Sequence, residues 1–215
     1  MAADDYTAAL QQRFSELFET AVRVFPVATG TAANALALAS LGPSWGNVYC
    51  SEVAHINTAE ANATGSSAAA SSSPQWPAVT ARSAPMRLAE TLAGISPGQI
   101  HRGQPAAVSL TQATDLGAVY SLDEIRAVAE VAKARGLKLH MDGARFANAT
   151  ARLGCSPAEP TWRSGIDIMS FGATKNGGAL CDAIVVFTPR LPKSSPCSCA
   201  APARSGRKCA LPRRS

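Results

Sequence analysis

The sequence predicts an α/β fold in which helices flank a mostly parallel central sheet. The clearest observation is a strand–helix–strand unit, in which apolar strands at 106–110 and 137–141 enclose a helical pattern at 122–135. Ser121 and the glutamate three residues later form a capping box before this helix, and Gly136 ends it. Strands connected in this way are parallel, and α/β folds place their sites at the carboxyl ends of such strands.

The first half of the chain shows the same alternation. Residues 6–20 carry apolar side chains at helical spacing, residues 22–27 form a short strand, and a helix rich in alanine and leucine is expected over 35–41. Gly30 and Thr31 lie in the turn between that strand and that helix. Free N–H groups and the helix dipole at such a turn form an anion site suited to phosphate. Simple capping of the helix is the plainer alternative.

A third strand is expected at 47–51, with His55 shortly after it, and a short helix at 86–92. A single histidine is more often a core or surface residue than a ligand. Its place just after a strand is also where α/β proteins put groups that contact ligands.

Residues 167–187 predict two apolar strands joined by a tight polar turn that carries Lys175. We expect this turn to hold the lysine amine close to an apolar core. Partial burial would favour the neutral amine, a nucleophile that can form a Schiff base with an aldehyde. From these residues alone, the alternative is a solvated turn lysine.

Asp142 stands at the carboxyl end of the strand 137–141. A carboxylate there caps a helix or pairs with a nearby base, for which Arg145 is the obvious candidate. The functional alternative is that Asp142 meets the cationic ring nitrogen of a cofactor, as enzymes dependent on pyridoxal phosphate (PLP) require. His140, on the same strand face, would support that carboxylate or simply pack.

The length of 215 residues allows one large domain or two small ones, and 47% hydrophobic residues allow a packed core. No apolar run approaches the roughly 20 residues of a membrane helix. The acidic N-terminus does not look like an export signal, and six irregularly spaced cysteines do not indicate a disulfide scaffold. We expect a cytoplasmic protein with no membrane partner.

The net charge of +5 is concentrated at the end of the chain. Residues 190–215 hold seven basic residues and no acidic one, which leaves residues 1–189 with a net charge of −2. We expect a folded region over 1–189, with an irregular Ser- and Ala-rich insert at about 64–82, and a basic tail over 190–215 without fixed structure. The three cysteines of this tail lack the spacing of a metal site, so no metal is expected.

Five motifs follow one another in a specific order. They are Val-Ala-Thr-Gly-Thr-Ala-Ala-Asn at 27–34, Ala-His-Ile at 54–56, Val-Ser-Leu-Thr-Gln-Ala-Thr-Asp-Leu-Gly at 108–117, His-Met-Asp-Gly-Ala-Arg-Phe at 140–146 and Phe-Gly-Ala-Thr-Lys-Asn-Gly at 171–177. In combination they closely resemble the low-specificity L-threonine aldolases. These are β-eliminating lyases, a PLP-dependent group with the aspartate aminotransferase-type fold. The resemblance covers roughly residues 5–63 and 104–188.

The resemblance implies a role for each motif residue. Lys175 would be the Schiff-base lysine, and Gly30 and Thr31 would hold the phosphate of PLP. His55 would stack on the ring and help to deprotonate the substrate hydroxyl. Asp142 would pair with the ring nitrogen, and Arg145 would contact the region of the phenolic oxygen.

The reaction implied is the cleavage of L-threonine, or a related β-hydroxy amino acid, to glycine and an aldehyde in threonine catabolism. A homodimer or homotetramer is expected for the family. The family pattern starts late and stops near Thr188, which implies a large domain that is incomplete at both ends and lacks the small domain. A frame change, a gene-model error or real divergence would each produce the abrupt changes in composition at the insert (about 64–82) and after Thr188. We therefore expect the chain as written to lack measurable aldolase activity.

Two other functions are compatible with the sequence. Within enzymes, the chain could be another PLP-dependent β-eliminating lyase or an aminotransferase-like enzyme. From a different class, it could be a non-catalytic protein whose basic tail binds RNA or another polyanion. The tail contains no aromatic residue that could stack on bases, so we expect no nucleic-acid partner.

Overall fold

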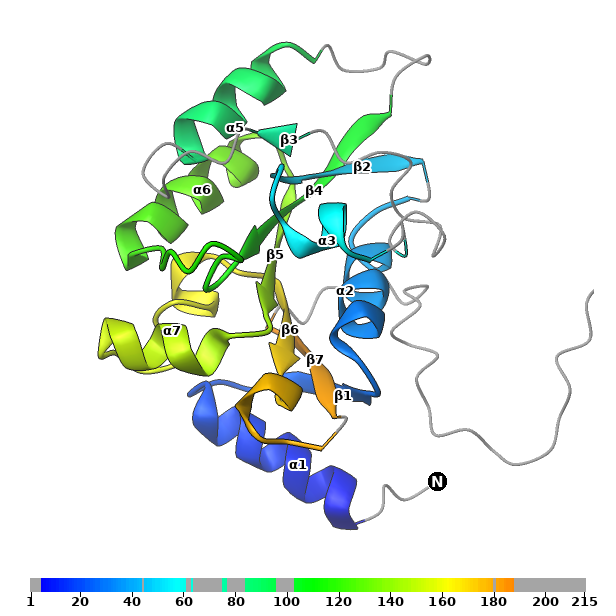
Figure 1. Cartoon of the computed structure of the whole chain (residues 1–215), viewed down its shortest axis with the longest axis vertical. Coiled ribbons are helices and arrows are strands. Elements are labelled where there is room, and N and C mark those ends of the chain that lie inside the picture. Colours follow the sequence, from blue (N-terminus) through cyan, green and yellow to red (C-terminus); the bar gives the residue numbers. More distant parts are fainter. Residues whose placement is uncertain are drawn as a thin grey trace, which may run out of the picture.

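A mostly parallel sheet forms the centre of the protein (Figure 1). The computed structural model describes residues 5–43, 45–60, 63, 75–76, 84–95, 103–179 and 181–187. The sheet has seven strands in the order β1-β7-β6-β5-β4-β2-β3. The strands are β1 (Arg23–Val27), β2 (Gly46–Ser51), β3 (Gln75–Trp76), β4 (Gln104–Thr111), β5 (Lys138–Gly143), β6 (Ile168–Gly172) and β7 (Asp182–Val186).

Only β7 runs against its neighbours. It pairs antiparallel with both β1 and β6, whereas β2, β3, β4, β5 and β6 pair in parallel. This arrangement confirms the predicted α/β class with a mostly parallel sheet. Because β7 runs in the opposite direction, its first residue, Asp182, lies at the edge where the parallel strands end.

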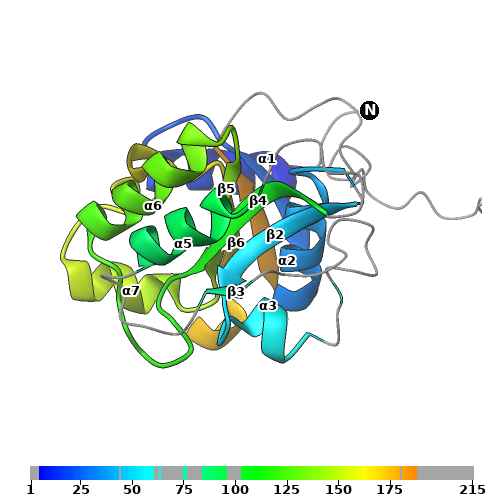
Figure 2. The same cartoon turned by 90° about the horizontal axis from the view of Figure 1, so that it is seen from above.

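Helices cover both faces of the sheet (Figure 2). One core packs the sheet against α5, α6 and α7 together with the end of α1, and a second core packs α2 against β6 and β7. A third packs the end of α2 and the short α3 against β2 and β4. The helices are α1 (Asp5–Leu17), α2 (Gly30–Ala39), α3 (His55–Thr58), α5 (Ala84–Ala93), α6 (Leu122–Ala134) and α7 (Phe146–Leu153).

The predicted strand–helix–strand unit is present as β4, α6 and β5. Ser121 and Glu124 form the expected capping box, in which the serine hydroxyl accepts from the Glu124 amide and the Glu124 carboxylate accepts from the Ser121 amide. Arg135 caps the C-terminus, and Gly136 follows at a φ of 68°, a left-handed conformation that favours glycine. The unit confirms that local signals set this part of the fold.

The N-terminal helix is shorter than the predicted 6–20. It ends at Leu17, and Glu19 adopts a φ of 55°, which is incompatible with continuing a right-handed helix. The change of direction brings Phe18 into the core, where its ring lies 5.0 Å from that of Phe187.

Two predicted segments lie largely outside the described residues. The basic tail at 190–215 is one, and the insert at about 64–82 is the other, apart from the two residues of β3. Within the described part of the chain, no helix has the length and apolar character needed to cross a bilayer.

Candidate active site

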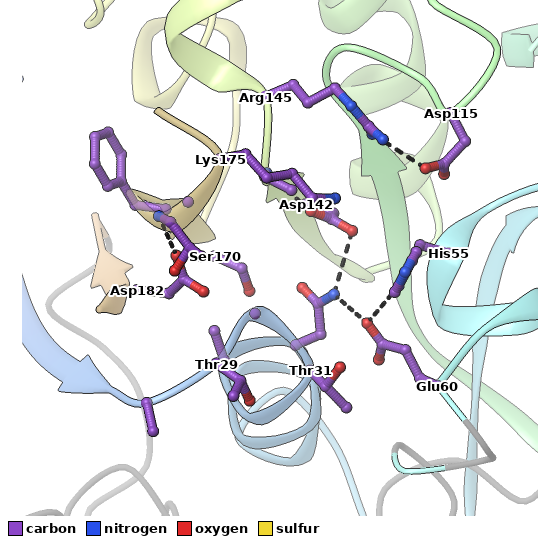
Figure 3. A pocket seen from close by; sticks show the side chains of 18 residues that line it. Thr29, Thr31, His55, Glu60, Asp115, Asp142, Arg145, Ser170, Lys175 and Asp182 are labelled. Atoms are coloured by element: carbon purple, nitrogen blue, oxygen red, sulfur yellow. Dashed lines mark hydrogen bonds and ion pairs between the residues drawn. The ribbon is translucent and has the colours of Figure 1, made fainter. Parts of the chain in front are cut away.

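A cavity of about 220 Å³ opens at the carboxyl edge of the sheet (Figure 3). Segments that follow β1, β2, β4, β5 and β6 line it, together with the start of β7. The cavity brings together every site residue predicted from the sequence. Those residues are Gly30, Thr31, His55, Asp142, Arg145 and Lys175.

The start of α2 forms one wall of the cavity. Thr29 caps the helix, and its hydroxyl accepts a hydrogen bond from the Ala32 amide at 3.2 Å. The helix itself supplies no partner for the amides of Gly30 and Thr31, because the first turn has no preceding carbonyls. These two amides and the helix dipole make this wall suited to an anion.

Asp142 is almost completely buried at the end of β5. Its carboxylate accepts hydrogen bonds from the Ala144 amide at 3.0 Å and from the Asn34 side-chain amide at 3.2 Å. Burial raises the pKa of Asp142, and these two donors only partly oppose that rise. A neighbouring cation would restore the charged form.

Of the alternatives considered for Asp142, an ion pair with Arg145 is contradicted by the structure. Arg145 instead forms an ion pair with Asp115, in the segment after β4, with 3.1 Å between its guanidinium and the Asp115 carboxylate. The Asp142 carboxylate is turned toward α2, while the arginine reaches across to the neighbouring strand's loop (Figure 3). Among the described residues Asp142 therefore has no ion-pair partner.

His55 begins α3 and lies to the right of Lys175 and Asp142 in the view of Figure 3. Its Nδ1 is 3.0 Å from Oε1 of Glu60, a buried carboxyl group. The same Oε1 accepts a hydrogen bond from Asn34 at 2.8 Å. Asn34 thus connects His55 and Glu60 to Asp142.

His140 lies beneath the cavity, between two serines. Its Nδ1 is 2.9 Å from the Ser109 hydroxyl and its Nε2 is 3.0 Å from the Ser170 hydroxyl. Complete burial lowers the pKa of His140 to about 3, so the ring is neutral. His140 therefore links its own strand, β5, to β4 and β6 through these two serines, while the hydrogen bonds of Asp142 described above go to Ala144 and Asn34.

Lys175 lies in the turn between β6 and β7, as predicted, but it is not partly buried. The turn is a short 3-10 helix, Thr174–Asn176, at the mouth of the cavity, and the lysine is exposed. The expectation that Lys175 is partly buried is therefore wrong in this structure. Strand β6 ends at Gly172, before the turn begins, so its apolar residues do not cover the Lys175 side chain.

The turn that carries Lys175 is held by Asp182. One Asp182 oxygen accepts hydrogen bonds from the amides of Ala173 at 2.9 Å and Thr174 at 3.1 Å. Gly172 lets the turn approach β5, because an added Cβ would lie 2.6 Å from Cα of Ala144. These contacts place the lysine and Asp142 at one cavity.

Comparison with known proteins assigns the chain to a family. The model of the beta-eliminating lyases matches residues 1–195. The chain belongs to the beta-eliminating lyase family. Curated low-specificity L-threonine aldolases are similar to it, with 45% identity over 193 residues for Pseudomonas sp. (strain NCIMB 10558) and 44% over 195 residues for Pseudomonas aeruginosa. These matches confirm the resemblance found in the five motifs.

The chain spans about half the length of those relatives. The two alignments cover 87% and 86% of this chain but 54% and 53% of the Pseudomonas proteins. Among solved structures, a threonine aldolase from Leishmania major has a TM-score of 0.77 at 24% identity, covering 89% of this chain and 56% of that one. A serine palmitoyltransferase from S. paucimobilis with bound PLP has a TM-score of 0.57 at 17% identity, covering 87% and 45%. These likenesses show the fold, the large domain of the PLP-dependent aminotransferase type.

Four residues that line this cavity were not singled out from the sequence. They are Asn34, Glu60, Asp115 and Asp182. Asn34 and Asp115 lie within the quoted motifs, and Glu60 follows His55 by five residues. Asn34 and Asp115 form contacts with segments that are distant in the sequence, whereas Glu60 and Asp182 bond to nearby residues at spacings that no motif indicates. No cluster of three or more metal-binding side chains occurs among the residues that the structure describes.

Proposed function

We propose that this protein carries the cofactor-binding and catalytic residues of the PLP-dependent aldol cleavage of L-threonine, or of a related β-hydroxy amino acid, to glycine and an aldehyde, and we expect no measurable turnover from the chain as written. The observation that carries the proposal is the convergence of Lys175, Asp142, His55 and the start of α2 on one cavity. The similarity to curated threonine aldolases supports the choice of substrate.

The residues of the cavity fit the cofactor chemically. The amides of Gly30 and Thr31, in the first turn of α2, would bind its phosphate. Asp142 is buried and has no ion-pair partner in the described part of the chain, so a protonated ring nitrogen would supply the missing cation. Lys175 offers an amine for the aldehyde, and Arg145, oriented by Asp115, would meet the phenolic oxygen. When bound, PLP supplies an electron-accepting ring for the breaking Cα–Cβ bond.

His55 is the proposed base. It lines the cavity and has a ring edge that does not contact Glu60. In aldol cleavage, the proton of the substrate β-hydroxyl must leave as the Cα–Cβ bond breaks. A neutral imidazole can take that proton near pH 7. Assembly as a homodimer or homotetramer is part of the proposal and can be tested by light scattering.

The deciding experiment maps the cofactor, which requires binding but no turnover. The purified chain is mixed with PLP, reduced with borohydride and digested, and we expect the label on Lys175. Label on another lysine in a folded sample would overturn the assignment. Lys175→Ala is the control, and it should remove the label.

Substrate cleavage is tested separately. Acetaldehyde and glycine formed in equal amounts from L-threonine would support aldol cleavage, and would also show that the activity needs nothing beyond this chain. Ammonia and a keto acid formed without acetaldehyde would instead favour another lyase of the family.

A further inference from the structure

We propose that Glu60 is a positioning residue that holds His55 as its Nδ1–H tautomer and so leaves Nε2 free as the base. Glu60 comes shortly after α3, which begins at His55, and its side chain is only 1% exposed, against 36% for the histidine. A buried carboxyl group is thus bonded to a ring that reaches the cavity. The tautomer follows from this chain's own contacts, and its catalytic meaning rests on the proposed function.

The first step concerns the amide of Asn34. Its Nδ2 lies 2.8 Å from Oε1 of Glu60 and 3.2 Å from Oδ2 of Asp142. Ionised carboxylates only accept hydrogen bonds, so a group between two of them must donate to both. The –NH2 group has two hydrogens and satisfies both neighbours. The orientation of the amide is thereby set, and Glu60 Oε1 is an acceptor.

The second step concerns the histidine. Nδ1 of His55 lies 3.0 Å from the same Oε1 that accepts from Asn34. In a neutral imidazole one nitrogen carries the proton and the other holds a lone pair, and the partner of each nitrogen selects between them. An acceptor opposite Nδ1 selects Nδ1–H. The lone pair then lies on Nε2, at the edge of the ring away from Glu60.

The third step concerns the reaction. During proton transfer the O–H bond of the substrate hydroxyl breaks, its electron pair stays on oxygen, and an Nε2–H bond forms on His55. The ring becomes positively charged, and the Glu60 carboxylate next to Nδ1 would stabilise that charge. With the opposite tautomer, Nε2 would already carry a proton and could not act as the base.

The test is the tautomer of His55 in the chain without cofactor. The protein contains three histidines, so labelling them with 15N gives few signals, and His55→Gln identifies the signal of interest. Spectra are recorded at about pH 8.5, where ordinary imidazoles, with a pKa of about 6.5, are neutral. We expect a protonated Nδ1 and a bare Nε2 for His55.

Three variants separate positioning from a structural role. Glu60→Gln keeps an acceptor oxygen and should retain the Nδ1–H form. Glu60→Leu removes the acceptor, and the signal should shift to a mixture containing mostly the Nε2–H form. Glu130→Leu makes the same change at an exposed position of α6 and should alter nothing. A purely structural role would leave the tautomer unchanged in every folded variant.

A wild-type His55 that is mainly Nε2–H overturns the proposal, as does a folded Glu60→Leu variant that keeps the wild-type tautomer. If Glu60→Leu does not fold, the tautomer of His55 in the wild type and in Glu60→Gln still tests the proposal, because both are expected to be Nδ1–H. The measurement uses no PLP, so a failure of Lys175 labelling would refute the proposed function while leaving this result standing.

Discussion

Asp142 and Glu60 both accept hydrogen bonds from one buried side-chain amide group, the –NH2 of Asn34. Asn34 donates from the same nitrogen to Glu60 at 2.8 Å and to Asp142 at 3.2 Å. Burial raises the pKa of both carboxyl groups. The neutral amide is therefore what allows two acidic groups to face each other across the cavity floor without a cation between them.

Replacing Asn34 by Asp should destabilise the fold strongly. The variant puts a third carboxyl group between two others, and donors become acceptors. We expect the free energy of unfolding to fall by about 3–5 kcal/mol at pH 8, measured by urea denaturation, as for an uncompensated buried charge. The loss should become smaller as the pH is lowered, because burial raises the pKa of both Glu60 and Asp142. Asn148→Asp, at an exposed position of α7, is the control and should cost under about 0.5 kcal/mol. Equal losses of unfolding free energy in Asn34→Asp and Asn148→Asp would contradict the hydrogen-bond network of Asn34, Glu60 and Asp142.

Asp142→Asn should separate chemistry from binding. The amides of Gly30 and Thr31 remain, so PLP affinity should change little. The partner of the ring nitrogen is lost, so exchange of the glycine α-proton with deuterated solvent should slow by roughly 100-fold or more. Asp123→Asn, on the exposed side of α6, should change neither quantity. Equal losses of affinity and exchange in Asp142→Asn would mean that the residue is structural.

Asp182 should control the position of Lys175. Asp182→Ala leaves two amides, those of Ala173 and Thr174, without their acceptor. We expect a loss of about 2–3 kcal/mol in the free energy of unfolding and weaker borohydride-dependent labelling of Lys175. Asp182→Asn keeps one acceptor oxygen and should lose less on both measures. Full labelling of Lys175 in a folded Asp182→Ala variant would show that the turn keeps its conformation without the Asp182 hydrogen bonds.

His140 should make the fold sensitive to acid. Its pKa is about 3 in the folded state and about 6.5 when unfolded, so the unfolded chain binds the extra proton between these values. The stabilisation is complete above pH 6.5 and is lost as pH falls toward 3. Between pH 7 and pH 4.5 the wild type should lose about 2.5 kcal/mol more than His140→Gln, which cannot be protonated. Urea denaturation at both pH values measures the difference, and parallel losses would refute the assignment.

The sequence by itself determined the elements and the order of the site residues. Strand and helix periods, the capping box at Ser121 and Glu124, and the strand–turn–strand around Lys175 are all local patterns. Each depends on neighbouring residues within one or two turns or one hairpin, so each can be recognised without knowing the fold. The motifs that follow strand ends lie together because parallel strands end at one edge.

Only the tertiary structure decided which side chains meet. Arg145 bonds to Asp115 because β4 lies next to β5 in the sheet, although Asp142 is its nearer acid in sequence. Asn34 reaches Asp142 and Glu60 because α2 crosses the sheet beside both. Lys175 is exposed because its turn extends past the sheet edge. Strand order and helix placement set these contacts, and both result from packing the whole core rather than from any local stretch of sequence.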